Sequence, residues 1–244
     1  MQGASPPSLF AAPATASHSL SRSQWALQER DGTLVQWTLV IPLKALTRAK
    51  SRLSDTAADG LRPGLALAFA QDTVAAALAC AAVTDVAVVT DDVLAGRELA
   101  ALGARIVPDE PAGGLNAALA HGASLVRSQS PGSPLAALNA DLPALRPLEL
   151  ARVLDAATEF PRAFLADAAG TGTTLLTASA DRELLPAFGP DSRTRHRASG
   201  AVELPLEAVD SVRQDVDTGD DLRAALALGV GPRTAAAVAN LNVA

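Results

Sequence analysis

Residues 37–43 of the chain read Trp-Thr-Leu-Val-Ile-Pro-Leu, and Lys44 follows at once. The run is rich in β-branched and large apolar side chains, carries no charge and closes with a proline and a leucine, which is typical of a buried strand. It therefore predicts the first strand of the fold, with a polar loop that begins at the carboxyl end of this strand.

Helical and strand-like patterns alternate after this strand. Helical spacing covers residues 63–81, 94–102, 115–126 and 147–160, and short apolar runs lie between these segments at residues 85–90, 105–107 and 135–138. Because parallel strands need crossover connections, the alternation predicts an α/β fold with a mainly parallel sheet and helices on both faces, in three layers. Beyond residue 160 we expect strands at residues 163–166, 174–177 and 211–216.

The composition limits the domain organisation. The chain has 244 residues, of which 49% are hydrophobic and only 3% aromatic, so the core must consist mainly of Ala, Val and Leu. We expect one folded domain over residues 37–232, between a disordered N-terminal tail of residues 1–36 and a C-terminal tail of residues 233–244. Residues 1–21 lack the positive start and the unbroken apolar run of a secretory signal.

Charge and cysteine content exclude several classes of function. The net charge of -6 leaves no broad basic face for nucleic acid. The single Cys80 excludes a disulfide bond within the chain and fits a reducing cytoplasm. The most apolar run, residues 74–89, is too short to cross a bilayer of about 30 Å. We therefore expect a cytoplasmic protein that binds neither nucleic acid nor a membrane.

The two lysines lie in one loop. The chain has 20 basic residues, and only Lys44 and Lys50 among them are lysines; Arg48 and Arg52 lie in the same segment. In open α/β sheets ligands bind beyond the carboxyl ends of the strands, and a compact ammonium group suits a phosphate. The loop is predicted to face phosphate, with a merely solvated basic loop as the alternative. It has neither a P-loop nor a dinucleotide-binding glycine pattern, which disfavours an ATPase of that type and a nicotinamide enzyme.

Three carboxylates are candidates for Mg²⁺ binding. Asp141 follows the strand expected at residues 135–138, and Asp215 and Asp217 alternate on the strand expected at residues 211–216, so that both face the same side. Mg²⁺ needs only one or two protein carboxylates beside substrate phosphates. Asp141 and Asp215 are the favoured ligands, whereas Asp217 also precedes Thr218, which is predicted to cap the next helix.

Two turns complete the set of candidate segments. Residues 170–173 read Gly-Thr-Gly-Thr, and residues 188–192 read Phe-Gly-Pro-Asp-Ser. Ser192 is expected to begin a helix, and its hydroxyl together with the first N–H groups of that helix is expected to hold an anion. The alternative is that both segments are ordinary turns and that Ser192 is a plain N-cap. Asp91 and Asp92 are interpreted as caps of the helix that follows them. Neither Cys80 nor any of the histidines is predicted to form a nucleophilic pair, so covalent catalysis is not indicated.

The chain resembles the phosphoenolpyruvate/2-phospho-L-lactate guanylyltransferases, which make a precursor of the deazaflavin coenzyme F-420. The matching segments occur in the same order and are residues 44–53, 113–116, 140–145, 170–173, 188–192 and 215–218. The resemblance covers residues 37–229. It implies a Rossmann-like nucleotidyltransferase fold that transfers GMP from GTP to phosphoenolpyruvate or 2-phospho-L-lactate and releases pyrophosphate. Either three-carbon acid remains open as the acceptor, as does direct transfer of the product to the next enzyme.

The resemblance also implies roles for single residues. The phosphoenolpyruvate contacts are Thr173, Gly189 and Ser192, with Thr174 as the alternative to Thr173. The Mg²⁺ ligands are Asp141, Asp215 and Asp217. The groups implied to face the triphosphate are Lys44, Lys50 and Arg52, and those near guanine and ribose are Gly113, Gly114 and Asn116. Two alternatives stay open: a nucleotidyltransferase for a sugar phosphate or a pterin, and a nucleotide-binding module without catalysis.

Overall fold

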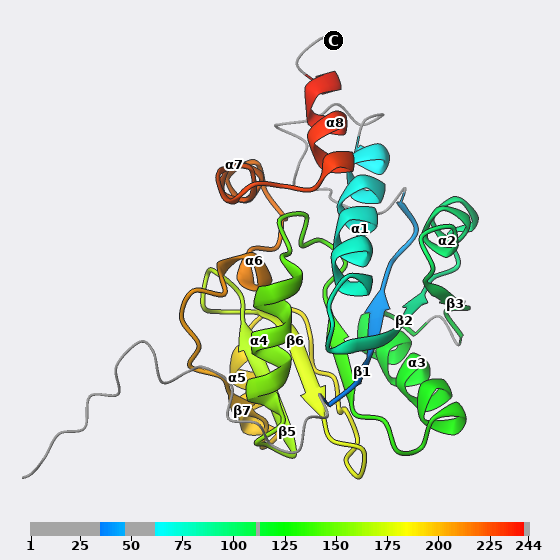
Figure 1. The fold of residues 1–244 in the computed structure, drawn as a ribbon, viewed down its shortest axis with the longest axis vertical. Coiled ribbons are helices and arrows are strands. Elements are labelled where there is room, and N and C mark those ends of the chain that lie inside the picture. Colours follow the sequence, from blue (N-terminus) through cyan, green and yellow to red (C-terminus); the bar gives the residue numbers. More distant parts are fainter. Residues whose placement is uncertain (1–34, 47–61, 111–112, 242–244) are drawn as a thin grey trace, which may run out of the picture. The chain divides into compact units, whose positions relative to one another are not determined.

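A mixed sheet forms the centre of the described part of the chain (Figure 1). The computed structural model describes residues 35–46, 62–110 and 113–241. The strands are β1 (Trp37–Pro42), β2 (Val83–Val89), β3 (Arg105–Val107), β4 (Leu135–Leu138), β5 (Arg162–Ala166), β6 (Thr173–Ala178) and β7 (Val202–Glu203). Their order in the sheet is β3-β2-β1-β4-β6-β5-β7. Only β6 runs antiparallel to its neighbours, so the prediction of a mainly parallel sheet is confirmed.

Helices cover both faces of this sheet. The helices of the described residues are α1 (Arg62–Leu78), α2 (Val93–Ala100), α3 (Leu115–Gln129), α4 (Pro147–Ala157), α5 (Ser192–Ala198), α6 (Asp210–Arg213), α7 (Gly219–Leu228) and α8 (Pro232–Leu241). On one face, α1, α2 and α4 pack on apolar side chains such as Leu39 and Ile41. On the other face, α3 packs on Val40 and its neighbours. The predicted three layers are therefore confirmed.

The strand β1 is buried along its whole length. All six of its residues are buried, because β2 and β4 pair with its two edges and helices cover both of its faces. Alternate side chains, Leu39 and Ile41 on one side and Val40 on the other, enter the two core clusters. This pattern explains why the run at residues 37–43 contains no charge.

The strand expected at residues 211–216 is not present. The short helix α6 takes its first part, because the Glu149 side chain accepts hydrogen bonds from the N–H and the hydroxyl of Ser211. Arg213 then donates to the carbonyl oxygens of Ala166 and Leu206 (2.7 and 3.1 Å). These contacts with distant segments outweigh the local strand pattern, so Asp215 and Asp217 do not lie on a pleated strand.

The folded chain also extends further than the expected boundary at residue 232. Residues 232–241 form α8, which packs on α1. A buried carboxylate of α1 caps the start of α8. Asp72 accepts hydrogen bonds from the N–H groups of Arg233 (3.2 Å) and Thr234 (2.7 Å). The expected tail of residues 233–244 thus contains a docked helix. Apart from residues 35 and 36, the expected N-terminal tail lies outside the described residues.

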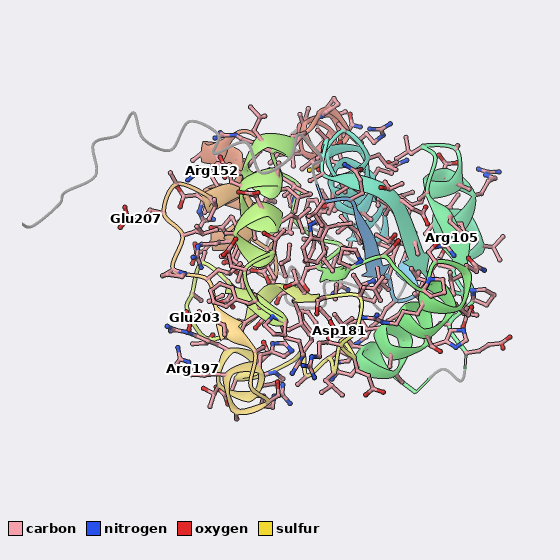
Figure 2. The ribbon with its side chains drawn as sticks, turned by 60° about the horizontal axis from the view of Figure 1, so that its bottom comes forward. Arg105, Arg152, Asp181, Arg197, Glu203 and Glu207 are labelled. Carbon is pink, nitrogen blue, oxygen red and sulfur yellow. The ribbon has the colours of Figure 1, made fainter. Side chains whose placement is uncertain are left out.

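Arginines on the periphery hold connecting loops in place. Arg152 of α4 donates to the carbonyl oxygens of Glu207 and Ala208 (3.1 and 2.8 Å), and Arg197 forms an ion pair with Glu203 (Figure 2). A planar guanidinium can donate to two acceptors at once, which a lysine cannot do with the same fixed geometry. These arginines therefore have structural roles besides their charge.

Two smaller expectations concern Cys80 and membranes. Cys80 is buried, and burial raises the pKa of its thiol, which agrees with a structural role. No helix in the described part of the chain is both long and apolar enough to cross a membrane.

The contact of α3 with the sheet depends on a glycine, and this gives a first prediction. A Cβ atom at Gly122 would lie 2.6 Å from Cγ2 of Val89 and 2.8 Å from Cγ1 of Val40. We expect Gly122→Ala to lower the free energy of unfolding by about 1–3 kcal/mol through overpacking, as measured by urea denaturation. In the control Gly132→Ala, a Cβ meets no atom within 4 Å, so a change within about 0.5 kcal/mol is expected. Equal effects of the two substitutions would contradict this close approach.

Candidate active site

A cleft of about 620 Å³ opens at the carboxyl ends of β1 and β4. The chain continues from β1 to β2 and β3 on one side and reaches β4 on the other, so this is the point where the strand order reverses. Ligands of open α/β sheets bind at such a point. The volume falls in the range of small-molecule sites, about 300–1,000 Å³.

Most of the predicted site residues meet in this cleft. Its walls include Lys44, Asp141, Thr173, Gly189, Ser192, Asp215 and Asp217. They come from segments that are up to 173 residues apart in the sequence, from Lys44 to Asp217. Lys50 and Arg52 lie outside the described residues, so the structure does not test their position. Gly113, Gly114 and Asn116 are not among the residues that line the cleft.

Two hydrogen bonds join the loops that carry Asp141 and Asp215. The N–H of Val216 donates to the carbonyl oxygen of Asp141 (3.1 Å), and Nδ2 of Asn139 lies 3.5 Å from Oδ2 of Asp215. Both carboxylates line the cleft, and Oδ1 of Asp141 is buried. The two residues are therefore neighbours because their loops are bonded, and not because of strand alternation.

Asp217 lies between the cleft and the start of α7. The following Thr218 caps α7 in a capping box with Asp221, as predicted, and the Asp221 carboxylate also accepts the N–H of Asp217 (3.1 Å). The Asp217 residue is exposed and still borders the cleft. Of the two acids interpreted as helix caps, Asp92 caps α2 and also accepts the N–H of Leu46 (2.9 Å), whereas Asp91 is not a cap and accepts the N–H of Asp109 (2.9 Å).

The described walls of the cleft are strongly negative. They carry five carboxylates, Asp141, Asp167, Asp191, Asp215 and Asp217, against the single cation Lys44. Phosphorylated substrates would be repelled by such walls unless cations accompany them. Within the described ranges, no three His, Cys, Asp or Glu side chains are arranged to hold a metal ion alone. The oxygen donors Asp141 and Asp215 fit a hard divalent cation that takes its other ligands from substrate and water.

A rigid turn forms the opposite wall. The Asp167 carboxylate accepts the N–H groups of Thr171 and Gly172, each at 2.9 Å. Gly172 is required there, because a Cβ atom would lie 2.3 Å from Oδ2 of Asp167. The turn leads directly into Thr173, the first residue of β6. Since β6 is antiparallel, its first residue reaches the sheet edge at which β4 and β5 end.

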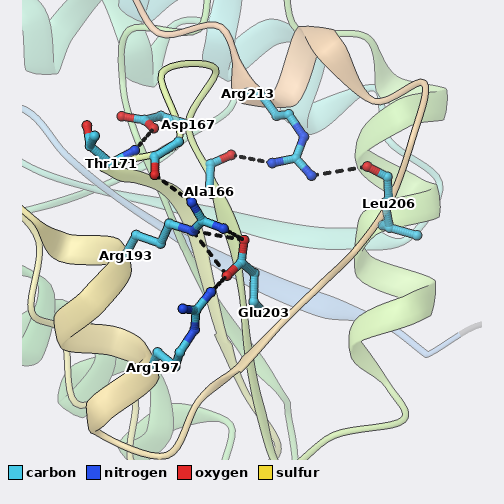
Figure 3. A network of polar contacts seen from close by, with 9 residues as sticks. Ala166, Asp167, Thr171, Arg193, Arg197, Glu203, Leu206 and Arg213 are labelled. Carbon is cyan, nitrogen blue, oxygen red and sulfur yellow. Dashed lines mark hydrogen bonds and ion pairs between the residues drawn. The ribbon is translucent and has the colours of Figure 1, made fainter.

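Arg193 fastens this turn to α5 (Figure 3). Its Nη1 donates to the carbonyl oxygen of Gly170 (2.8 Å), and its Nε donates to the Glu203 carboxylate (3.0 Å). Arg197 pairs with the same carboxylate. Burial alone would raise the pKa of Glu203, but hydrogen bonds and charge from both arginines hold it below its usual value. The arginines that follow Ser192 thus brace the site from outside.

Asn116 clamps the turn that contains Gly189. Its Oδ1 accepts the N–H of Phe188 (2.8 Å), and its Nδ2 donates to the carbonyl oxygen of Phe188 (3.1 Å). Gly189 has a φ of +111°, and a Cβ atom would lie 3.1 Å from Nη2 of Arg195. Only glycine meets both conditions readily. The Asn116 amide is therefore engaged with backbone that adjoins the cleft.

The helix α5 begins at Ser192, as expected from the sequence. However, its first N–H groups already have protein partners: that of Ser192 donates to Gly189 and that of Arg193 donates to Thr171. The expectation that these two amides hold an anion is therefore wrong, because the helix start is joined to both wall turns. The Ser192 hydroxyl remains the polar group that this residue can offer to the cleft.

His196, one of the histidines for which the sequence indicates no nucleophilic partner, lies directly behind the site. Its ring is completely buried, and its Nδ1 is 2.9 Å from Oγ1 of Thr173. Its Nε2 accepts the N–H of Ala187 (2.9 Å). Burial, assisted by the charges of Arg162 and Arg195, lowers the pKa of His196 to about 4. The available signal was its spacing of four residues from Ser192, which places both on one helix face.

The family follows from comparison with known proteins. The family model described as "Guanylyl transferase CofC like" matches residues 37–242. The chain belongs to this family. The protein is thus a guanylyltransferase. The family does not support the alternative of a nucleotide-binding module without catalysis.

Similar proteins support this membership. The phosphoenolpyruvate guanylyltransferase of Streptomyces coelicolor is 80% identical over 210 residues, which cover 86% of this chain and 99% of that protein. The enzyme of the same name from Streptomyces avermitilis is 82% identical over 209 residues, covering 86% of this chain and 97% of that protein.

Solved structures confirm the nucleotidyltransferase fold. A putative nucleotide-diphospho-sugar transferase from Desulfovibrio desulfuricans has a TM-score of 0.58 at 15% identity, covering 85% of this chain and 98% of that one. A nucleotidyl transferase from Methanothermobacter thermautotrophicus has a TM-score of 0.56 at 22% identity, covering 79% and 97%. Rv0371C of Mycobacterium tuberculosis, solved as a complex with manganese, has a TM-score of 0.50 at 21% identity, covering 79% and 99%. At such low identities these structures show only that the guanylyltransferase shares their fold.

The clamp by Asn116 gives a second prediction. In Asn116→Asp the introduced carboxylate has no donor for the Phe188 carbonyl oxygen, and we expect the free energy of unfolding at pH 7 to fall by about 1–3 kcal/mol. The loss should shrink below about pH 4, where the protonated carboxyl group donates again. Urea denaturation across pH checks both effects. The matched control is Gln129→Glu in the same helix, where Oε1 only accepts a bond from Arg105 and little change is expected.

The buried imidazole gives a third prediction. His196 has a pKa of about 4 in the folded protein against 6.5 ordinarily. Between these values the unfolded chain binds a proton that the folded chain does not, so the free energy of unfolding falls as the pH is lowered from 6.5 to 4. The slope due to this residue reaches about 1.4 kcal/mol per pH unit. Comparing native protein with His196→Leu by urea denaturation cancels the carboxylate contributions, and identical slopes would contradict the burial of a neutral imidazole.

Proposed function

We propose that the enzyme transfers GMP from GTP to the phosphate group of phosphoenolpyruvate, forming enolpyruvyl-diphospho-guanosine and pyrophosphate. The observation that carries this proposal is the composition of a single cleft. Lys44, Asp141 and Asp215 lie at the ends of the parallel strands or beside them, and Thr173, Gly189 and Ser192 line the same cleft. The names of the similar Streptomyces enzymes support phosphoenolpyruvate as the acceptor.

The reaction agrees with the side chains that the cleft offers. An oxygen of the acceptor phosphate attacks the α-phosphorus of GTP in line, a new oxygen–phosphorus bond forms, and the bond to the bridging oxygen of the leaving pyrophosphate breaks. The attacking oxygen is already ionised, so no general base is required. In keeping with this, the described cleft walls contain carboxylates and one lysine but no histidine or cysteine. Catalysis then rests on positioning and on electrostatic stabilisation.

Asp141 and Asp215 are the proposed protein ligands of Mg²⁺, with Asp217 as a further candidate. When bound, Mg²⁺ offsets the negative charge of the phosphates and of the leaving pyrophosphate. Lys44 supplies a positive charge from the end of β1, and we propose that Lys50 and Arg52 contribute from the same loop. Gly113 and Gly114 stay proposed as neighbours of guanine and ribose. For Asn116, the bonds to Phe188 support a role in holding the acceptor side.

The acceptor side has donors for a small phosphorylated acid. Phosphoenolpyruvate carries a carboxylate and a phosphate, and 2-phospho-L-lactate carries the same two groups, so both can use Thr173, Gly189 and Ser192. We place the reaction in coenzyme F-420 biosynthesis on the strength of the motifs in the sequence. The product would then be passed to the enzyme that next consumes it, and direct transfer is part of this proposal.

The experiment that tests this function measures pyrophosphate release from GTP with a panel of acceptors. Phosphoenolpyruvate, 2-phospho-L-lactate, 3-phosphoglycerate, a sugar phosphate and a phosphorylated pterin are compared with Mg²⁺ present. We expect turnover with phosphoenolpyruvate or 2-phospho-L-lactate. Turnover only with the sugar phosphate or the pterin would refute the proposed acceptor and favour the corresponding alternative.

A variant series tests the metal ligands in the same assay. We expect Asp141→Asn and Asp215→Asn each to lower kcat at least about 100-fold, since metal binding supplies several kcal/mol of charge stabilisation. The matched control is Asp155→Asn on the exposed surface of α4, which should keep native turnover. Full turnover of Asp141→Asn at low Mg²⁺ would show that the assignment of this ligand is wrong.

A further inference from the structure

The ring of His196 is bonded in one fixed sense. The backbone N–H of Ala187 can only donate, so Nε2 of His196 must be the acceptor of that 2.9 Å bond. A neutral imidazole carries one N–H group. The proton of His196 therefore lies on Nδ1, which faces Oγ1 of Thr173 at 2.9 Å.

This tautomer determines what the Thr173 hydroxyl can do. Because Nδ1 donates, Oγ1 of Thr173 is an acceptor in this bond, and its own hydrogen is not used by His196. Among the described residues, Nδ1 of His196 is the hydrogen-bond partner of this oxygen. Thr173 lines the cleft with 4% of its surface exposed. The hydroxyl hydrogen is thus available to a ligand in the cleft. With the opposite tautomer, Thr173 would show the ligand only lone pairs, which repel an anionic oxygen.

The surroundings keep the ring neutral and in place. The ring of Phe188 contacts His196 edge-on at a centroid distance of 4.9 Å, and Phe164 lies at 5.8 Å. Burial of the ring opposes protonation, and the charges of Arg162 and Arg195 add to this effect. A protonated ring would place a second N–H against the N–H of Ala187. The two hydrogen bonds of the ring connect Thr173 with Ala187, which leads into Phe188 and Gly189. One imidazole therefore joins the start of β6 to the turn that contains Gly189.

We propose that His196 is a positioning residue that holds the Thr173 hydroxyl as a hydrogen-bond donor to an anionic oxygen of the acceptor substrate. His196 does not line the cleft and acts only through Thr173. That the anionic oxygen belongs to the acceptor rests on the proposed function. The orientation of the hydroxyl rests on the hydrogen bonds alone. The two parts can therefore be tested separately.

The first experiment measures the tautomer directly in the unliganded enzyme. The chain has three histidines, so ¹⁵N NMR of the imidazole nitrogens is simple to assign by comparison with His196→Asn. We expect the protonated Nδ1 form for His196 at pH 7, whichever acceptor the enzyme uses. Protonation on Nε2, or a charged ring, would overturn the proposal even if phosphoenolpyruvate proves to be the substrate.

The second experiment is a double-mutant cycle in the pyrophosphate assay, run with whichever acceptor supports turnover. We expect Thr173→Val and His196→Leu each to raise the acceptor KM about tenfold while the GTP KM stays native, and the double variant to be no worse than Thr173→Val. Thr173→Ser, which keeps the hydroxyl, should restore binding. Additive effects of the two substitutions, or equal rises in both KM values, would show that His196 supports the fold generally.

A conservative pair guards against simple unfolding. In His196→Asn an amide nitrogen can occupy the place of Nδ1 and donate to Thr173, whereas in His196→Gln the amide lies further out, near the place of Nε2. We expect the asparagine variant to keep a lower acceptor KM than the glutamine variant, with thermal unfolding measured for both. His121→Asn, outside the cleft, is the control for loss of an imidazole. Equal acceptor KM values for the asparagine and glutamine variants would overturn the proposal.

Discussion

The parallel pairing of β1 with β4 is the constraint on which the site depends. It joins strands that are nearly 100 residues apart and brings their carboxyl ends to one edge of the sheet, so that Lys44 and Asp141 line the same cleft. The antiparallel β6 then adds its first residue, Thr173, to that edge. If β6 ran parallel, its carboxyl end would lie there instead. The reversal of one strand thus brings Thr173 into the cleft that Lys44 and Asp141 also line.

The charge of the cleft explains how an acidic protein handles polyanions. The charged side chains of its described walls are five carboxylates and one lysine, and this favours binding of phosphates together with a divalent cation over binding by basic side chains alone. Among the described residues, Lys44 is the cation that lines this cleft. Arginine has a different task in much of the protein. Several guanidinium groups each donate to two or more backbone carbonyl oxygens; they belong to Arg127, Arg152, Arg162 and Arg213. A forked donor suits this role, which gives the excess of arginine over lysine a structural cause.

Prediction from sequence succeeded where one local rule was sufficient. The periodicity placed each strand from β1 to β6 within about two residues, and the rule that ligands bind at carboxyl ends selected Lys44 and Asp141. It failed where distant contacts outweighed the local pattern. Residues 211–216 looked like a strand, but Glu149 and the carbonyl oxygens of Ala166 and Leu206 impose a short helix and a bonded loop. In the same way, Asp72 draws residues 232–241 into a helix on α1, where a tail was expected.

The sequence by itself determined the α/β class, the family and most of the candidate site, because hydrophobic periodicity and ordered motifs are local properties. Only the tertiary structure decided how these groups act together. It showed that Asp215 is beside Asp141 through bonded loops, that the first amides of α5 already have partners, and that His196 is buried behind Thr173. The direction of a hydrogen bond depends on which groups meet in space. No spacing along the chain records that the N–H of Ala187 meets Nε2 of His196, and this contact determines which hydrogen the cleft offers to a substrate.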